Sequence, residues 1–562
     1  MPHARLSISG RSGSGLLPLL ALLGCAPEAA SPTISSPAAL QDRGATTASD
    51  ELAAALGVAL PSLLRPQILA DVPAAAVARL RARGDIAGLQ ALYDELSWQN
   101  FVAINWPTDD AGRPQHRLSD PGMPAWVAWR ESAEVFAEDG SPPPAWGSPL
   151  RSLSRRSHGL AGLPPGAGLS LGERILSPAR RSPHAEGLNQ PFSLPLWDQN
   201  GGLVYYEVLI NRAEFDYIVA NQLYNLDGQV AFASRHPGRD LDPGSCNHPN
   251  RSIVVFPAGR PDSDEVGAIE IKLAWRVLSA RDIESRYLTI DGWVPRDLRV
   301  EGSCATSDLH VVAAGPDWKP VRLGLVGFHI GHKTASAPQW VWSTFEHIDN
   351  LGVDSREAER LARHGQTLRP SFYDPTCPGC PVNTCAAPPQ KNQLQRLLPI
   401  DRRTAALNAR LRHLLAAHGS KLAYYELVGS QFPTQPEAPP TRPRAEPGCS
   451  GEEAVPINLP DSVHNKSGGR PHPVFLTNLT LESFFQRGVQ PACLQVEPGI
   501  CPDPLPPGAP TVFGSESCIG CHSSAPIASG GTPKPGTQEA TYNTQLSGDY
   551  SWLLSQRAFW KK

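Results

Sequence analysis

The most chemically specific stretch of the chain is Cys518-Ile519-Gly520-Cys521-His522, a Cys-x-x-Cys-His run. This spacing is the attachment signature of a c-type haem. Each thiol can add across one haem vinyl group, and the adjacent imidazole can then bind the iron as its proximal ligand. The alternative is a disulfide or zinc pair that a histidine happens to follow. The run therefore predicts one covalent haem c on Cys518 and Cys521, with His522 on the iron.

The motif does not fix the ligand on the other side of the iron. The apolar and aromatic segment 323–350 carries His329, His332 and His347. A buried neutral histidine needs a hydrogen-bond partner or a metal, so each is a candidate distal ligand, and each can also be a hydrogen-bonded core residue. Met123, the one methionine after Met1, fits a surface or gap-filling side chain better than a ligand. A histidine, another weak ligand and an open site all remain as alternatives.

An open iron site would allow acid–base chemistry. Glu346 and His347 are neighbours in the sequence, with Asp349 close behind. A distal histidine with a carboxylate can handle the protons of bound peroxide. The simpler interpretation is a polar turn after a strand. Trp340 and Trp342 either line the haem and relay electrons or pack in the core.

The N-terminus has the features of a bacterial export signal. Two arginines precede a short apolar run, Leu16–Leu23, and Leu22-Leu23-Gly24-Cys25 resembles the lipobox whose cysteine becomes the lipidated first residue. The run is too short to span a bilayer. A plain secretory signal cleaved near Ala29-Ala30 is the alternative. We expect a periplasmic protein whose one membrane attachment is a lipid on Cys25, with the outer membrane favoured.

The composition is that of a globular secreted protein. Hydrophobic residues make up 41% of the chain and charged residues 19%, which is enough apolar material to bury a core. The formal net charge of −4 gives no reason to expect binding to nucleic acid or to an anionic membrane surface. If haem is bound, a redox partner protein is the expected partner. The 58 prolines indicate long and abundant loops.

The cysteines not assigned to lipid or haem number eight. They are Cys246, Cys304, Cys377, Cys380, Cys385, Cys449, Cys493 and Cys501. An even number in an oxidising compartment predicts up to four disulfides. Cys377-Pro378-Gly379-Cys380 has redox-motif spacing, but proline follows it, so it is not a second haem site. A structural knot with Cys385 is favoured over a redox pair, and zinc is a third alternative.

Periodicity and turn residues predict an α+β fold with a mainly antiparallel sheet and peripheral helices. Helices are expected within 51–105, after Trp126, and at 212–223, 402–418, 479–487 and 549–558. Strands are expected at 203–210, 252–256, 265–278, 286–290, 310–313, 323–332 and 423–427. The type of the aromatic element Trp340–Ile348 is open. Long loops are expected at 138–200, 365–400 and 432–455.

These patterns divide the chain into four parts. They are a signal peptide at 1–24, a flexible tether at 25–50, an α+β body at 51–470 and a haem-attachment segment at 471–562. Only 40 residues follow His522, whereas a stand-alone class I cytochrome c domain needs far more chain after its motif. We therefore expect a cytochrome c-like segment docked on the larger body, where its apolar helices find a surface to bury against.

Four stretches together resemble a group of bacterial exported cytochrome c family proteins of similar length. The stretches are Trp98–Pro107, Gln339–His347, Thr477–Gln486 and Ser517–His522. The similarity runs from about residue 95 to the last residue, and the Pro- and Cys-rich insertions look less typical. The resemblance implies one covalent haem, held by Cys518 and Cys521 with His522 on the iron. It implies no substrate.

The first expected function is therefore that of an exported monohaem c-type cytochrome in periplasmic electron transfer. A haem peroxidase or oxygenase with an open distal site is the second, using His329 or His347 with Glu346. A lipid-anchored binding or sensor protein with structural haem is the third. The size of the body favours the last two, because an electron shuttle does not need over 500 residues. The lack of a second haem motif speaks against the peroxidase, since many bacterial c-type peroxidases use two haems.

Overall fold

A computed structural model of the protein describes most of the chain after residue 63. The described residues are 64–148, 194–235, 253–260, 263–305, 309–438, 469–473, 475–486, 517–523, 525–542 and 548–562, with the backbone of 174–175, 442–443 and 454–455. All of them belong to one unit, Asp50–Lys562. The predicted signal peptide, Cys25, the tether, most of the 138–200 loop and four cysteines (Cys246, Cys449, Cys493, Cys501) lie outside the described residues.

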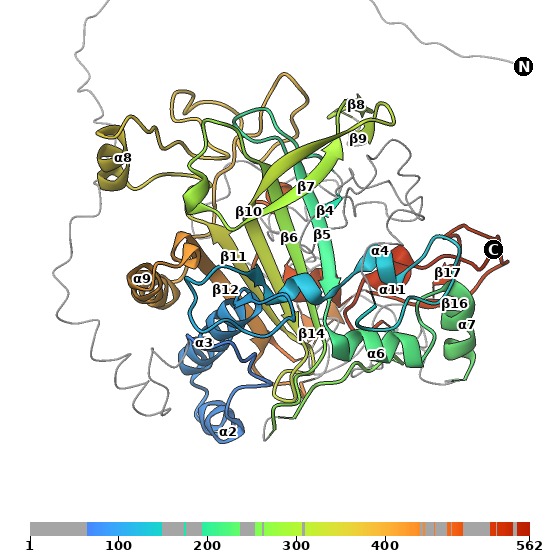
Figure 1. The fold of residues 1–562 in the computed structure, drawn as a ribbon. Helices are drawn as coiled ribbons and strands as arrows, with labels where there is room; N and C mark the ends of the chain where they lie inside the picture. The colour runs from blue at the N-terminus through green and yellow to red at the C-terminus, as the bar shows by residue number, and fades with distance from the viewer. Residues whose placement is uncertain are drawn as a thin grey trace, which may run out of the picture. The chain divides into compact units, whose positions relative to one another are not determined.

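A nine-stranded sheet organises the unit (Figure 1). Its strands are β3 (Arg130–Glu131), β4 (Arg174–Ile175), β5 (Val204–Ile210), β6 (Ile269–Val277), β7 (Thr289–Pro295), β10 (Trp318–His332), β11 (Val341–His347), β12 (Tyr425–Pro433) and β15 (Pro471–His472). The order is β15-β12-β11-β10-β6-β5-β3, with β7 beside β10 and β4 beside β7. Every pair is antiparallel except β4 with β7. The prediction of an α+β fold with a mainly antiparallel sheet is confirmed.

The central strand β10 has two faces that differ in chemistry. Paired residues on neighbouring strands point to the same side of a sheet, and successive residues of a strand point to opposite sides. Phe328 pairs with Leu273 and Phe345, whereas His329 pairs with Lys272 and Thr344. We call the side of Phe328 the core face and the side of His329 the motif face.

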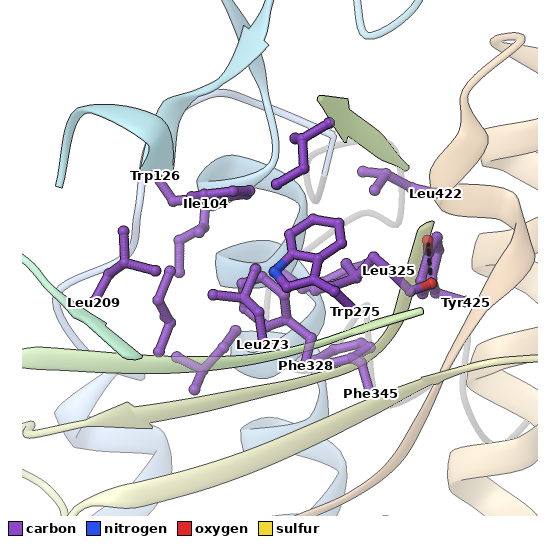
Figure 2. Packing of buried hydrophobic residues seen from close by; sticks show 14 of the residues in the cluster. Ile104, Trp126, Leu209, Leu273, Trp275, Leu325, Phe328, Phe345, Leu422 and Tyr425 are labelled. Carbon is purple, nitrogen blue, oxygen red and sulfur yellow. Dashed lines mark hydrogen bonds between the residues drawn. The ribbon is translucent and has the colours of Figure 1, made fainter. Parts of the chain in front are cut away.

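Two long helices pack on the core face. They are α3 (Ile86–Ile104), which follows α2 (Ala74–Ala82), and α9 (Arg402–Ala417). Phe101 of α3 stacks on Phe345 with ring centroids 4.0 Å apart and meets Phe328 edge-on at 5.4 Å. Figure 2 shows Phe328 and Phe345 beside Leu273 and Trp275 in this cluster. Each fully buried side chain of this kind stabilises the fold by about 1.5–3 kcal/mol.

The other described elements are short. The helices are α4 (Ser132–Val135), α6 (Arg212–Ala220), α7 (Leu226–Ser234), α8 (Ser355–Ala362), α10 (Cys518–His522) and α11 (Leu553–Arg557), with 3-10 turns η2 (Ala125–Ala128), η3 (Glu284–Arg286), η4 (Lys421–Tyr424) and η6 (Ser483–Phe485). Four strand pairs stand apart from the sheet: β1 (Pro107–Thr108) with β2 (Met123–Pro124), β8 (Leu298–Glu301) with β9 (His310–Ala313), β13 (Arg442–Pro443) with β14 (Ala454–Val455), and β16 (Ala528–Gly530) with β17 (Thr541–Tyr542). No helix among the described residues is long and apolar enough to cross a membrane.

Most of the expected elements are confirmed, and the aromatic element of undecided type is strand β11. The strand expected at 252–256 is wrong over the described residues 253–256. Ile253, Val254 and Phe256 are buried there, but the backbone N–H groups of Val255 and Phe256 donate to the side chains of Tyr217 and Asp549 instead of to a neighbouring strand.

The helix expected at 479–487 is also wrong, since only the turn η6 forms. Side chains take the backbone donors that a helix would use, which is how Asn, Thr and Glu compete with helical structure. The N–H of Thr480 donates to the Asn478 side chain, and that of Leu479 donates to Glu346. The helix expected at 549–558 is reduced to the five residues of α11.

The loop expected at 365–400 is confirmed, since it contains no helix or strand. Two disulfides hold it: Cys377–Cys380 within the loop, and Cys304–Cys385, which ties it to the segment after β8. Cys385 is thus not joined to the Cys377–Cys380 pair, and the choice between a structural knot and a redox pair stays a prediction.

Candidate functional site

The Cys-x-x-Cys-His run forms the short helix α10, which packs on the motif face of the sheet. Gln431 of β12 holds the start of this helix with both ends of its amide. It donates to Ser517 Oγ at 2.6 Å and accepts from the N–H of Ile519 at 2.7 Å. Gln431 and Ile519 are both fully buried, so the contact fixes α10 at one level of the sheet.

The two cysteines of the run are thiols, three residues apart on one side of the helical turn. Cys518 is buried, and its Sγ lies 3.3 Å from the carbonyl oxygen of Leu476. Burial and the nearby Glu482 carboxylate raise the pKa of Cys518 well above its usual value, so this sulfur is protonated. Cys521 is half-buried.

His522 has a defined tautomer. Its Nδ1 lies 2.7 Å from the carbonyl oxygen of Tyr550, and a carbonyl only accepts, so Nδ1 carries the hydrogen. Burial lowers the pKa of His522 to about 3, which keeps the ring neutral and leaves a lone pair on Nε2. A hydrogen bond from the second ring nitrogen to a backbone carbonyl is the usual support of a metal-binding histidine. The ring also lies against Trp342 of β11, with centroids 4.0 Å apart.

The backbone around His522 is strained at three places. Trp340, Asp549 and Tyr550 have φ values of 65°, 49° and 72°, in the left-handed region that side chains disfavour. Such residues cost about 1–3 kcal/mol each and cluster at functional sites. A buried ion pair holds this loop, because Lys333 Nζ lies 2.6 and 2.7 Å from the two oxygens of Asp549.

Three further polar residues lie near α10 on the motif face: Lys272, His329 and Glu482. His329 is buried, and its Nε2 is 3.3 Å from Glu482 Oε2 without hydrogen-bond geometry to any described residue. Burial alone would raise the pKa of Glu482, but the neighbouring His329 and Lys272 lower it, so Glu482 is ionised. Burial lowers the pKa of Lys272 against the opposing effect of Glu482 and the two cysteines.

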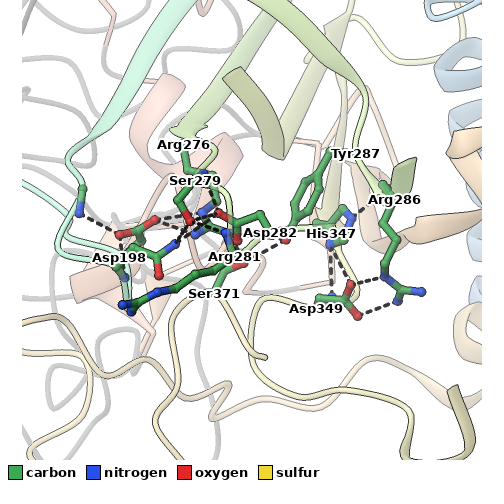
Figure 3. Close-up of polar contacts among 12 residues, drawn as sticks. Asp198, Arg276, Ser279, Arg281, Asp282, Arg286, Tyr287, His347, Asp349 and Ser371 are labelled. Atoms are coloured by element: carbon green, nitrogen blue, oxygen red, sulfur yellow. Dashed lines mark hydrogen bonds and ion pairs between the residues drawn. The ribbon is translucent and has the colours of Figure 1, made fainter. Parts of the chain in front are cut away.

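His347 does not belong to this group. Its Nε2 donates to the carbonyl oxygen of Arg286 at 3.0 Å, and its Nδ1 accepts from the N–H of Asp349 at 3.1 Å. Its ring stacks on Tyr287 at 4.1 Å, and burial lowers the pKa of His347 to about 4. Figure 3 shows this network, in which Asp349 also makes a two-pronged ion pair with Arg286. Both ring nitrogens of His347 are therefore engaged in holding the sheet end.

The structure separates Glu346 from His347, because consecutive strand residues point to opposite faces. Glu346 accepts from the N–H of Leu479 at 2.7 Å and pairs with Arg396 at 2.5 Å. The expected acid–base combination of Glu346 with His347 is thus not assembled. The carboxylate that does lie beside a candidate histidine is Glu482.

His332 and Met123 are also away from α10. His332 is three residues after His329 on β10 and faces α3, where its Nδ1 lies 3.1 Å from the amide nitrogen of Asn100. Burial lowers the pKa of His332 to about 3. Met123 is 37% exposed on the hairpin strand β2. Of the three candidate distal histidines, His329 alone shares the face of the sheet on which α10 packs.

The roles of Gln431, Tyr550, Lys272 and Glu482 were not predicted from the sequence. Lys272 did not stand out, because charged residues Glu270, Lys272 and Arg276 alternate with apolar ones along Ile269–Val277. Tyr550 acts through its backbone, so its residue type carries no signal.

Across the described ranges, no three His, Cys, Asp or Glu side chains are grouped as ligands for a bare metal ion. Comparison with known proteins gave no match to a protein-family model, to a curated protein or to a solved structure. The resemblance to exported cytochrome c family proteins stays a prediction.

Proposed function

We propose that this protein is an exported monohaem c-type cytochrome that transfers electrons in the periplasm. Cys518 and Cys521 would hold the haem, and His522 would be its proximal ligand. The observation that carries the proposal is the hydrogen bond from His522 Nδ1 to the Tyr550 carbonyl oxygen. It fixes the ring while leaving Nε2 unprotonated, as an iron ligand requires.

The donor set fits such a group. Two thiols one helical turn apart match two vinyl groups, and the neutral imidazole follows directly. When bound, a haem supplies a one-electron couple. The protein's own residues hold the motif through Gln431, orient the imidazole through Tyr550 and Trp342, and limit solvent access by burying Cys518 and Ile519.

His329 is the distal ligand we favour. It shares the motif face with α10, it is buried, and its Nε2 makes no hydrogen bond of good geometry to a described residue. A histidine in the sixth position gives the iron a lower reduction potential than methionine would.

A second candidate function is a haem peroxidase or oxygenase with an open distal site. The observation that favours it is the 3.3 Å approach of His329 to Glu482, both buried. Here His329 would accept and return the proton of a bound peroxide instead of binding iron, and Glu482 would stabilise its protonated form.

The attachment is tested by the mass and the alkaline pyridine spectrum of the exported protein. We expect one covalent haem, and we expect Cys521→Ala to prevent normal two-point attachment. The matched control is the double variant Cys377→Ala/Cys380→Ala, which removes the other Cys-x-x-Cys pair and should keep the haem. Complete covalent haem in Cys521→Ala would refute the assignment.

The two candidate functions are separated by adding carbon monoxide to the reduced protein. A low-spin spectrum that does not change indicates six-coordinate iron and electron transfer. A high-spin spectrum or rapid binding indicates an open site and favours the enzyme.

Export and the lipid on Cys25 are proposed from the sequence pattern. The test is Cys25→Ser, which should release the protein from the membrane fraction without changing its haem content. Membrane retention of Cys25→Ser would contradict the lipid anchor.

A further inference from the structure

We propose that a row of aromatic side chains carries electrons between His522 and the protein surface at Tyr217. The proposal rests on the proposed haem at Cys518 and Cys521 and adds the route by which an electron reaches it. The row runs His522–Trp342–Trp340–Phe256–Tyr217.

Each step of the row is a direct ring contact. The ring centroids of His522 and Trp342 are 4.0 Å apart, and those of Trp342 and Trp340 are 5.8 Å apart, with the indoles stacked at 22°. Trp340 meets Phe256 edge-on at 5.9 Å, and Phe256 meets Tyr217 at 5.0 Å. All four distances lie within or below the 4.5–7 Å range typical of interacting aromatic pairs.

The row passes through four separate parts of the chain, so it is not a by-product of one helix or strand. His522 is on α10, Trp342 is on β11 with Trp340 two residues before it, Phe256 is in an irregular segment and Tyr217 is on α6. Electron tunnelling falls steeply with the gap between groups and is favoured by delocalised π systems in contact. A continuous series of rings is therefore a better route than the aliphatic packing around it.

The geometry of Trp340 argues for more than core packing. Its backbone is strained, with φ at 65°, and a bulky residue there is a genuine outlier. Its indole nitrogen is buried and faces the Asp549 carboxylate, whose pKa it lowers as a hydrogen-bond donor. A left-handed φ costs a bulky residue about 1–3 kcal/mol, so the ring is held in this place against a backbone preference. Gly331 gives the neighbouring ring room, since a Cβ there would come within 3.0 Å of Trp342.

The row ends where a partner can approach. Tyr217 is half-buried, and its hydroxyl accepts from the N–H of Val255, a side chain that is 52% exposed. Arg212 and Asp216 on the same helix are exposed and form a surface ion pair with each other. The partner is a protein with a one-electron redox centre. In each transfer one electron passes from ferrous iron to that centre, leaving ferric iron, and no proton moves.

The experiment places a ruthenium photosensitiser on Asp216→Cys, next to Tyr217, and measures the rate of light-driven electron transfer to the haem. We expect Trp340→Leu to remove most of this rate, because it opens a gap in the row. Phe256→Leu breaks the row at a different contact and should do the same, so the test survives if one variant does not fold. Trp340→Phe keeps a ring and should slow the transfer less than Trp340→Leu.

The matched control carries the same label on Thr532→Cys, an exposed position after β16 and outside the row. Its rate should be unchanged by Trp340→Leu and Phe256→Leu. Equal losses from both labels, or no loss from Asp216→Cys, would overturn the route while leaving the haem in place. A labelled protein without covalent haem would instead overturn the proposed function and the route together.

Discussion

The core face and the motif face of strands β10 and β11 come from alternate residues of the same two segments, but their side chains differ in chemistry. On the core face, Phe328, Ile330 and Phe345 pack against α3 beside a buried hydrogen-bonded group that includes Asp94 and Ser430. On the motif face, the alternate positions are His329, Gly331 and Trp342, next to a thiol, an imidazole and a carboxylate. Both faces bury polar groups, whose desolvation opposes folding unless they are hydrogen-bonded. Those of the core face are held in direct hydrogen bonds, whereas His329 Nε2 on the motif face has none of good geometry among the described residues.

The difference shows where stability and function separate within one sheet. Because alternate residues of a strand face opposite sides, each strand can carry a close-packed core and a polar site at the same level. Substitutions on the core face should therefore act on the free energy of unfolding, and substitutions on the motif face should act on the site.

The largest effect is expected from Phe345→Ala. Truncating this buried ring, which stacks on Phe101, should lower the free energy of unfolding by about 3–5 kcal/mol. The matched change on the other face is Thr344→Val, one residue away. It removes the Thr344 hydroxyl, which accepts a hydrogen bond from the Asn478 side-chain amide at 2.7 Å, and should lower the free energy of unfolding by about 1 kcal/mol. Urea denaturation measures both, and equal costs would break the proposed contrast between the faces.

The Lys333–Asp549 ion pair lies on the motif face, but we expect it to stabilise the fold and not only the site. Lys333→Met leaves the Asp549 carboxylate buried without its cation, and we expect a loss of about 3 kcal/mol. Restoring balance with Lys333→Met/Asp549→Asn should recover much of this loss. Full stability of Lys333→Met would show that the loop at 549–550 does not depend on the pair.

Asp94 on α3 gives the core face a pH dependence. Burial raises the pKa of Asp94 to about 6, although Ser430, Thr404 and Gln90 donate hydrogen bonds to it. Between the unfolded pKa of 3.8 and about 6 the folded state binds more protons, so stability falls as the pH rises through this range. Asp94→Asn should remove up to about 3 kcal/mol of that fall. Denaturant unfolding curves measure this change at pH 4, close to the unfolded pKa of 3.8, and at pH 7, above the folded pKa of about 6. The same pH dependence of stability in the wild type and in Asp94→Asn would contradict the prediction.

The most specific effect on the site is expected from His329→Ala. With haem bound, it should shift the optical spectrum towards high spin and allow carbon monoxide to bind. His332→Ala, on the same strand but facing α3, should leave the spectrum unchanged. If His332→Ala lost the low-spin spectrum instead, the distal ligand would lie on the core face, and the assignment of His329 would be wrong.

The sequence predicted the sheet well because its apolar runs are long and its turns are marked by Gly, Pro and Asp. Strand parity could also have separated His329 from His332, since an odd spacing of three puts them on opposite faces of any strand. The errors came where tertiary contacts replace regular hydrogen bonding. At 479–487, Asn478 and Glu346 capture backbone donors that periodicity assigns to a helix.

The site itself was predicted in part. The spacing of Cys518, Cys521 and His522 identifies the run, but not the residues that hold it. Gln431 acts through an ordinary amide 88 positions from Ile519, and Tyr550 acts through a carbonyl. Neither contact leaves a motif in the neighbouring sequence, so both can be identified only from the folded structure.

The hydrogen bond between His522 and Tyr550 joins residues that are synthesised at different times. The two residues are 28 positions apart, so the carbonyl leaves the ribosome, and crosses any export channel, later than the imidazole it orients. A maturation enzyme that meets Cys518 and Cys521 on an emerging chain would therefore meet His522 before its ring is locked. On the proposed function, cofactor attachment would then precede the docking of residues 548–562.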